Sequence, residues 1–288
     1  MIGSVFAQRF SIEATRPSVA EIDALAAIVP AGTPVYLTAV PAVDVRELTA
    51  TAARLRRAGL EPVAHIAVRR LTSIAQWQET LRALRTESDM RRLLVIGGDA
   101  DAAGPFADAL ALIQKGRLRE AGIEEIGIGA YPEGHPRIQP GRLEAATDEK
   151  VAAARAGGLR VHIVSQFSFA PDVVVTWLTR LRQCGIAVPV KIGMAGPASL
   201  NGLMRYARRC GVNASLRGLT SGVAASLVGQ AAGHAGPDRL LAALAAAPGL
   251  GDAAPHYFSF GGILPTARYA CEAAAGRMTG GHAMARSN

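Results

Sequence analysis

The residues with the clearest capacity for chemistry are six polar side chains that each follow a separate apolar run. A carboxylate, an imidazole, a phenol or an amide in such a place can move a proton or hold a polar ligand. Successive members stand 25 to 35 residues apart, about the length of one strand–helix unit. If the apolar runs are parallel strands of a closed barrel, all six side chains lie at one mouth. They are Glu13, Thr38, His65, Asp99, Tyr131 and Gln166.

Each of these residues also has an ordinary structural explanation, so the argument depends on their convergence. Glu13 stands in Phe-Ser-Ile-Glu-Ala, where a carboxylate is costly to bury without a purpose, although it could cap a neighbouring loop. Asp99 follows two glycines that would let a ligand approach the backbone, or it could cap the next helix. His65 could be a satisfied core histidine, and Gln166 could tie down a loop. We expect a functional site at the mouth because the six occur together.

Sequence motifs for several other chemistries are missing. The six histidines are dispersed, with no His-x-His or His-Glu-x-x-His pattern and no cysteine pair beside them, so no metal site is predicted. No Ser-His-Asp arrangement and no Gly-x-x-x-x-Gly-Lys phosphate loop stands out. A chain with few candidate nucleophiles indicates that an organic cofactor carries the difficult chemical step.

The elements that would position these residues alternate between strand and helix. Several apolar runs are preceded by a small residue, a glycine and an aliphatic residue, as expected where a helix ends in a left-handed glycine. The sequences Ser18-Val-Ala-Glu21 and Ser73-Ile-Ala-Gln76 predict capping boxes at two helix starts. The glycines of the recurring joins are Gly59, Gly122, Gly158, Gly185 and Gly211.

Eight nearly continuous apolar runs predict parallel strands that are buried on both faces. We therefore predict an α/β fold, a single (βα)8 TIM barrel that occupies residues 1–288 as one catalytic domain. A doubly wound open sheet is the alternative, but no Gly-x-Gly-x-x-Gly follows the first strand. The Ala- and Gly-rich stretch 213–255 predicts helices before the last strand. The predicted strands are Phe10–Ala14, Val35–Val40, Pro62–Val68, Leu93–Gly97, Ile126–Tyr131, Val161–Phe167, Val188–Met194 and Tyr257–Phe260.

Composition limits the partners and the location that we expect. The net charge of +8 fits a small anionic ligand, and also nucleic acid or an anionic membrane. The arginines recur at helical spacing without interleaved aromatic residues, as at Arg54, Arg56 and Arg57, so no nucleic-acid partner is expected. Three cysteines without a Cys-x-x-Cys pair fit a reducing compartment. With no signal-peptide core and no long uncharged apolar run, we expect a cytoplasmic protein without a membrane partner; a homo-oligomer stays open.

The most specific string in the chain is Tyr131-Pro132-Glu133-Gly134-His135-Pro136, preceded by Gly-Ile-Gly-Ala. It resembles the Ala-Tyr-Pro-Glu-x-His-Pro signature of the methylenetetrahydrofolate reductases, whose flavin domain is a (βα)8 barrel. Further matches occur in order between about residues 9 and 190. They are Phe10-Ser-Ile-Glu13, Thr38 in the second strand, Ala64-His65-Ile66, Gly98-Asp99 and Ser165-Gln166-Phe167.

The resemblance implies an FAD-dependent oxidoreductase of one-carbon metabolism. NAD(P)H would reduce the flavin and leave, and folate would then enter the same pocket, where 5,10-methylenetetrahydrofolate and 5-methyltetrahydrofolate interconvert. Glu13 is implied as the general acid that helps open the methylene bridge, with Asp99 as a second catalytic residue. Glu13, Asp99 and Gln166 would bind the folate. The residues implied to contact FAD are Thr38, His65, Gly98, Asp99, Ala107, Tyr131, His135 and Lys150.

The chain departs from the family pattern at two positions that concern the ligands. The family's arginine before Gly-Asp is Gly97 here, which raises the alternative of a flavin-free enzyme that passes hydride directly from NAD(P)H to folate. The family's last strand ends in an arginine that touches folate, and this chain has Gly262 there. That departure raises a second alternative, a folate-binding relative without turnover. Glu13, Asp99 and Gln166 occurring together favour an active enzyme.

Overall fold

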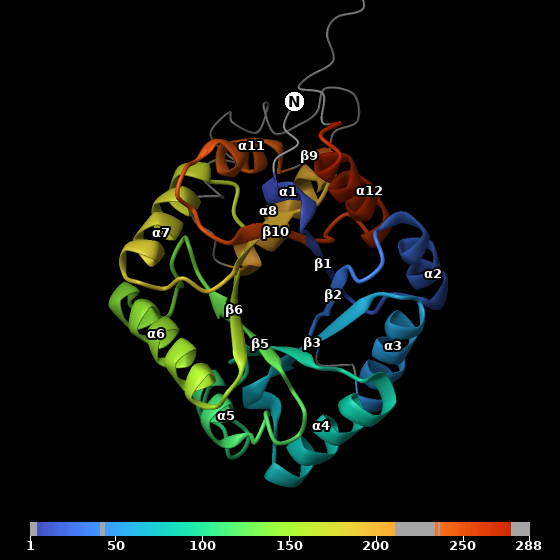
Figure 1. The fold of residues 1–288 in the computed structure, drawn as a ribbon, viewed down its shortest axis with the longest axis vertical. Coiled ribbons are helices and arrows are strands. Elements are labelled where there is room, and N and C mark those ends of the chain that lie inside the picture. The colour runs from blue at the N-terminus through green and yellow to red at the C-terminus, as the bar shows by residue number, and fades with distance from the viewer. Residues whose placement is uncertain (1–4, 41–43, 211–233, 236, 278–288) are drawn as a thin grey trace, which may run out of the picture.

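The computed structural model describes residues 5–40, 44–210, 234–235 and 237–277, and its centre is a closed barrel of parallel strands. Eight strands pair in the order β1-β10-β7-β6-β5-β4-β3-β2, and the pairing of β10 with β1 closes the ring. Helices surround the barrel on its outer side (Figure 1). The predicted (βα)8 barrel is therefore confirmed. Its extent as one domain over residues 1–288 stays a prediction.

Seven of the eight strands lie close to the predicted runs. The exception is the last one, which begins at Ala253 instead of Tyr257 and ends at Phe258. The barrel strands are β1 (Ser11–Ala14), β2 (Pro34–Leu37), β3 (Glu61–Ala67), β4 (Arg92–Ile96), β5 (Glu125–Ala130), β6 (Arg160–Ser165), β7 (Val190–Ala195) and β10 (Ala253–Phe258). A short antiparallel pair, β8 (Ala198–Ser199) with β9 (His234–Ala235), lies apart from the barrel sheet.

The helices fill the intervals between the strands. None of the helices that the structure describes is long and apolar enough to cross a membrane. Within the stretch 213–255, α11 bears out the prediction of helix, while residues 213–233 and 236 lie outside the described part. The helices are α1 (Val5–Gln8), α2 (Val19–Ile28), α3 (Val45–Arg57), the 3-10 turn η1 (Val68–Arg70), α4 (Ile74–Ser88), α5 (Ala109–Lys115), α6 (Pro140–Ala156), α7 (Pro171–Gln183), α8 (Leu200–Cys210), α11 (Asp238–Ala246) and α12 (Ile263–Ala274).

Local signals in the sequence explain several helix ends. The Ser18–Glu21 capping box is present in both directions. At Ser73 only half of the predicted box forms: its hydroxyl accepts the N–H of Gln76, but the Gln76 side chain accepts the N–H of Thr72. Four of the five join glycines have positive φ between 68° and 87°, as a left-handed helix end requires, and Gly211 lies outside the described residues.

The two faces of the barrel sheet differ in chemistry. Side chains that face the helices, such as Ile12, Val95 and Ile163, belong to a large aliphatic core. The inward side chains form a small apolar cluster around Tyr36 and Leu94, and three buried histidines accompany it. Because the side chains of a strand alternate between its faces, the aliphatic runs build the shell and the residues between them build the interior.

A polar chain crosses the barrel interior below the mouth. The Nδ1 of His162 lies 2.8 Å from the Glu125 carboxylate, so its Nε2 accepts the hydroxyl of Tyr36 at 2.8 Å. The His162 imidazole is the largest cause that lowers the pKa of Glu125 to about 2. Lys191 lies 5.9 Å from the centre of the Tyr36 ring, and burial lowers its pKa to about 8.

Gly127 provides the space for this polar chain. A Cβ atom at Gly127 would lie 2.7 Å from His162 Nε2 and 2.9 Å from Leu94 Cδ1. At Gly129, the next inward position of the same strand, the nearest atom would be Ile96 Cγ2 at 3.6 Å, an ordinary contact.

Gly127→Ala is expected to reduce the free energy of unfolding by about 1–3 kcal/mol, since overpacking must displace His162 or Leu94. Gly129→Ala is the matched control and should change it much less. Urea denaturation of both variants measures the difference. Equal stabilities for the two variants would contradict the assignment of Gly127 as the tight position.

Candidate active site

Glu13 lies deep in the mouth, at the carboxyl end of β1. Its side chain is only 13% exposed. The Thr38 hydroxyl donates to Oε1 at 3.3 Å, while the Nε2 atoms of His65 and His256 lie 3.6 and 3.4 Å from Oε2. The hydroxyl of Ser259 donates to the backbone carbonyl of Glu13 at 2.6 Å, which links the segment after β10 to β1. The carboxyl group is thus contacted by residues of three other strands or strand ends, β2, β3 and β10.

The surroundings of Glu13 favour its protonated form. Burial raises the pKa of Glu13, and the opposing effects of His65 and of the Thr38 hydrogen bond are smaller. Burial also lowers the pKa of His65 and takes that of His256 well below its ordinary value. Both imidazoles are therefore neutral near pH 7 and supply no full positive charge to keep the carboxylate ionised. A raised pKa brings a carboxyl group closer to the range in which general acid catalysis is efficient.

Ser11 contacts the ring nitrogen of His256 that faces away from this carboxyl group. The Ser11 hydroxyl lies 2.9 Å from His256 Nδ1, and both residues are buried. A neutral imidazole carries one N–H, and an ionised Glu13 can only accept a hydrogen bond. With Glu13 ionised, Nε2 of His256 is therefore the donor, and Nδ1 accepts the hydroxyl proton of Ser11. The Ser11 hydroxyl can donate to Nδ1 in this way once Glu13 has lost its proton.

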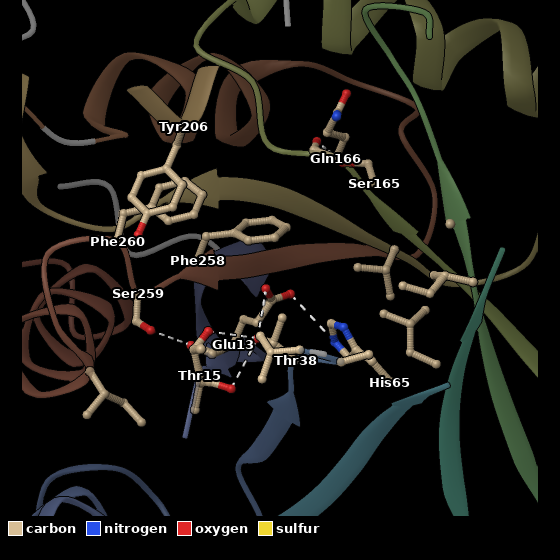
Figure 2. Close-up of a pocket in the computed structure, with 18 of the residues that line it drawn as sticks. Glu13, Thr15, Thr38, His65, Ser165, Gln166, Tyr206, Phe258, Ser259 and Phe260 are labelled. Carbon is tan, nitrogen blue, oxygen red and sulfur yellow. Dashed lines mark hydrogen bonds and ion pairs between the residues drawn. The ribbon is translucent and has the colours of Figure 1, made fainter. Parts of the chain in front are cut away.

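All six polar residues at the predicted strand ends line one pocket of about 540 Å³ at this mouth. Figure 2 shows Thr38 and His65 beside Glu13, and Gln166 with its side chain directed away from Glu13. Asp99 is exposed at the rim, where it follows Gly98. The geometric expectation of convergence is therefore met, with the acid at the bottom and the other groups around it.

An aromatic wall, formed by Tyr206, Phe258 and Phe260, lies on the other side of Glu13 from His65 (Figure 2). The rings of Tyr206 and Phe260 stack with centres 4.1 Å apart and planes 12° apart. Phe258 and Phe260 stack at 5.5 Å and 27°. Phe167 meets Phe260 edge-on behind the wall. Such a wall suits a flat heteroaromatic ligand.

The four other residues implied to contact FAD do not line this pocket. Gly98, with φ of 85°, follows β4, and the Ala107 carbonyl accepts a hydrogen bond from Arg69. The His135 ring packs edge-on against Tyr131, with centres 4.9 Å apart. Lys150 lies on α6, where burial lowers its pKa against the opposing charge of Asp108. The roles of Gly98, Ala107, His135 and Lys150 in holding a cofactor stay predictions.

Several residues of the site were not foreseen. His256 was placed before the last predicted strand, so its inward position was missed. The aromatic wall depends on Tyr206 from α8, which no strand-end pattern marks. A second cavity of about 620 Å³ lies between α6 and α7, and Tyr131 borders both cavities. Across the residues that the structure describes, no three His, Cys, Asp or Glu side chains gather to hold a metal ion.

Comparison with known proteins identifies the family. The sequence profile of methylenetetrahydrofolate reductase matches residues 15–216, which is more than half of the chain. The chain belongs to the methylenetetrahydrofolate reductase family. A 5,10-methylenetetrahydrofolate reductase of Pectobacterium carotovorum subsp. carotovorum is 27% identical over 154 residues, covering 52% of this chain and 49% of that protein. This chain thus matches about half of the length of that reductase.

The fold has also been seen in a solved structure. An uncharacterized protein from Clostridium thermocellum that binds two copies of 5-methyl-5,6,7,8-tetrahydrofolic acid superposes with a TM-score of 0.50. It is 11% identical, and the alignment covers 93% of this chain and 92% of that one. At this identity the comparison shows the barrel fold alone.

The methylenetetrahydrofolate reductase match covers only part of the candidate site. Thr38, His65 and Asp99 lie inside residues 15–216, whereas Glu13 and His256 lie outside them. Closure of the barrel brings the two parts together, because β1 pairs with β2 on one side and with β10 on the other. Geometry therefore carries the assignment of Glu13 to this site.

Glu13→Gln should make the protein more stable than the wild type at pH 8, and this advantage should shrink as the pH falls towards 4. The pKa of Glu13 is higher in the folded state than in the unfolded state. The free energy of unfolding of the wild type therefore falls as the pH rises from the unfolded-state pKa through the folded-state pKa. Each unit by which the folded-state pKa exceeds the unfolded-state pKa corresponds to about 1.4 kcal/mol in the free energy of unfolding. Urea unfolding of both proteins across this pH range measures the effect.

Glu21→Gln is the control with the opposite sign. The backbone hydrogen bond from Ser18 is the largest cause that lowers the pKa of Glu21. Its replacement should destabilise the protein at neutral pH, with the loss disappearing in acid. If Glu13→Gln instead destabilises the protein at neutral pH and not in acid, as expected for Glu21→Gln, the pKa of Glu13 is not raised by folding.

Proposed function

We propose that this chain is an FAD-dependent oxidoreductase of the methylenetetrahydrofolate reductase type, with Glu13 as its general acid. It would interconvert 5,10-methylenetetrahydrofolate and 5-methyltetrahydrofolate, with NAD(P)H as the source of reducing equivalents. The observation that carries this proposal is the buried Glu13 in one pocket with Thr38, His65, Asp99 and Gln166, where the family resemblance assigns the flavin and the folate.

The pocket fits the ring system of a flavin. Its aromatic wall offers a stacking surface, and the buried Nε2 of His65 has no hydrogen-bond partner among the described residues. Thr38, His65, Asp99 and Tyr131 would hold the cofactor at the mouth. When bound, the flavin would supply the hydride chemistry that no side chain of this chain can supply.

Glu13 would supply the proton. A methylene bridge between two nitrogens opens when one of these nitrogens is protonated, because it then becomes a neutral leaving group. The proton on the Glu13 carboxyl group would pass to that nitrogen as the carbon–nitrogen bond breaks. The neutral imidazoles of His65 and His256 would accommodate the resulting carboxylate, since an Nε2–H of His256 can donate to it. Asp99 and Gln166 at the rim would hold the polar edge of the pterin.

The two alternatives differ in measurable ways. A flavin-free enzyme gives a colourless preparation that still oxidises NAD(P)H in the presence of methylenetetrahydrofolate. A folate-binding relative binds folate without turnover in either direction. Gly262 lines the pocket at the position where the family has an arginine that touches folate. The affinity for folate is therefore the measurement that tests the second alternative.

The purified protein is expected to show flavin absorption and to release FAD on denaturation. NADH or NADPH should bleach this absorption anaerobically, and methylenetetrahydrofolate should restore it. Glu13→Gln should still be bleached, but its reoxidation by folate should slow by about 10²–10⁴-fold, the usual contribution of a general acid.

Glu79→Gln, on the exposed face of α4, is the matched control and should leave both half-reactions unchanged. Reoxidation of Glu13→Gln at the wild-type rate would exclude Glu13 as the acid. Loss of both half-reactions would indicate that Glu13 acts in flavin binding instead.

A further inference from the structure

Arg69 lies across the end of β4, beside the two glycines that precede Asp99. Its backbone N–H donates to the Gly97 carbonyl at 3.1 Å, so η1 is attached to the end of β4. The three heavy atoms nearest to a Cβ built on Gly97 are Cζ, Nε and Nη2 of Arg69, with Cζ at 3.8 Å. The guanidinium therefore occupies the space into which a side chain at position 97 would point.

Neutral acceptors hold Arg69 in this position. Its Nε donates to the Ala107 carbonyl at 3.0 Å and its Nη1 to the Gly98 carbonyl at 3.3 Å. Within the described ranges, no carboxylate lies at ion-pair distance from Arg69. Arginines on the outer helices differ, since Arg54 pairs with Asp23 and Arg142 with Glu149. The charge of Arg69 is therefore not neutralised by a partner, and Nη2 has N–H groups that these two bonds do not use.

Further cationic groups surround the same rim. Arg69, Arg137 and Asp99 all act on the His135 imidazole, whose pKa is lowered mainly by burial and then by Arg137. Arg70 borders the pocket and donates to the Ala39 carbonyl at 3.4 Å. Arg69 and Arg137 thus act on the same imidazole as the exposed Asp99, and Arg70 lines the same pocket as Asp99. This excess of positive charge fits an anionic group of a ligand.

The backbone at this point is not crowded: the atoms of Arg69 nearest to a Cβ built on Gly97 lie at 3.8 to 4.0 Å, an ordinary van der Waals distance. A guanidinium offers a planar pair of N–H donors that matches two phosphate oxygens. The 3-10 turn η1, which follows β3, thus provides a cation beside position 97, where the family has its arginine.

We infer that Arg69 binds a phosphate of the FAD pyrophosphate and replaces the arginine that Gly97 lacks. This assignment rests on the proposed flavin dependence. Flavin in the pocket and pyrophosphate over Gly97-Gly98 would direct the adenosine towards Ala107 and Lys150. The absence of arginine at position 97 then no longer argues for a flavin-free enzyme.

The test compares FAD with riboflavin, which carries the same ring system but no phosphate. Binding to the flavin-stripped full-length protein is measured by quenching of flavin fluorescence. Arg69→Ala should weaken FAD binding by about tenfold to a hundredfold, as expected for a lost charge-assisted contact, and should leave riboflavin binding unchanged. Arg57→Ala, on the outer helix α3, is the matched control and should change neither.

The double variant Arg69→Ala/Gly97→Arg distinguishes a phosphate contact from support of the loop. It returns a guanidinium to the same space from β4, so it should recover most of the lost FAD affinity. Arg69→Lys keeps the positive charge but lacks the planar pair of N–H donors, so it should bind FAD with intermediate affinity. Riboflavin binding by each variant reports whether the pocket is intact. It therefore distinguishes a misfolded Arg69→Ala protein from one that has lost only the phosphate contact.

The outcomes separate this inference from the proposed function. Wild-type protein that binds FAD while Arg69→Ala binds it equally well would overturn the role of Arg69 and leave the flavoenzyme intact. Equal losses of FAD and riboflavin affinity without rescue by Gly97→Arg would also overturn it. Wild-type protein that binds neither ligand would overturn both proposals.

Discussion

An eight-stranded barrel leaves room inside only for the side chains that fill it, and this chain fills that room largely with titratable groups. His162 and Glu125 satisfy each other, while Tyr36 closes the chain from the other side. Gly127 carries no side chain because His162 occupies its space. Above this layer, the basic side chains that the structure describes at ion-pair distance from Glu13 are the neutral imidazoles of His65 and His256. Burial beside these neutral groups thus raises the pKa of Glu13.

The mouth is divided into two regions with different electrostatics. Around Glu13 the partners are buried and uncharged, which suits proton transfer to a ligand that excludes water. Beside Gly97 lies the Arg69 guanidinium, which has no ion-pair partner among the described residues and suits a phosphate group. A dinucleotide is itself divided in this way, with a flat ring at one end and phosphates beyond it. In the proposed function, the flavin ring would lie in the first region and the phosphates in the second.

The sequence predicted the barrel well because parallel strands buried on both faces leave a direct mark in apolar runs. The last strand was predicted four residues late because Pro255 and the alanines before it resemble a loop, and this error hid His256. Tyr206 was missed since stacking on Phe260 depends on how α8 packs over the mouth. Arg69 was missed for a similar reason: its side chain crosses from the end of one strand to the next. Contacts between distant segments set these positions, and no local pattern records them.

Closure also determines which side chains of β10 face the site. His256 points inward, whereas Tyr257 packs among the outer helices against Phe10 and Tyr269. Because β10 is bonded to β7 on one side and to β1 on the other, moving it by one residue would break two ladders at once. Deleting one residue from a loop changes only the loop, but deleting one within β10 reverses the parity of every later position in that strand. The evolutionary freedom of this chain to gain and lose residues is therefore confined to the segments between its strands.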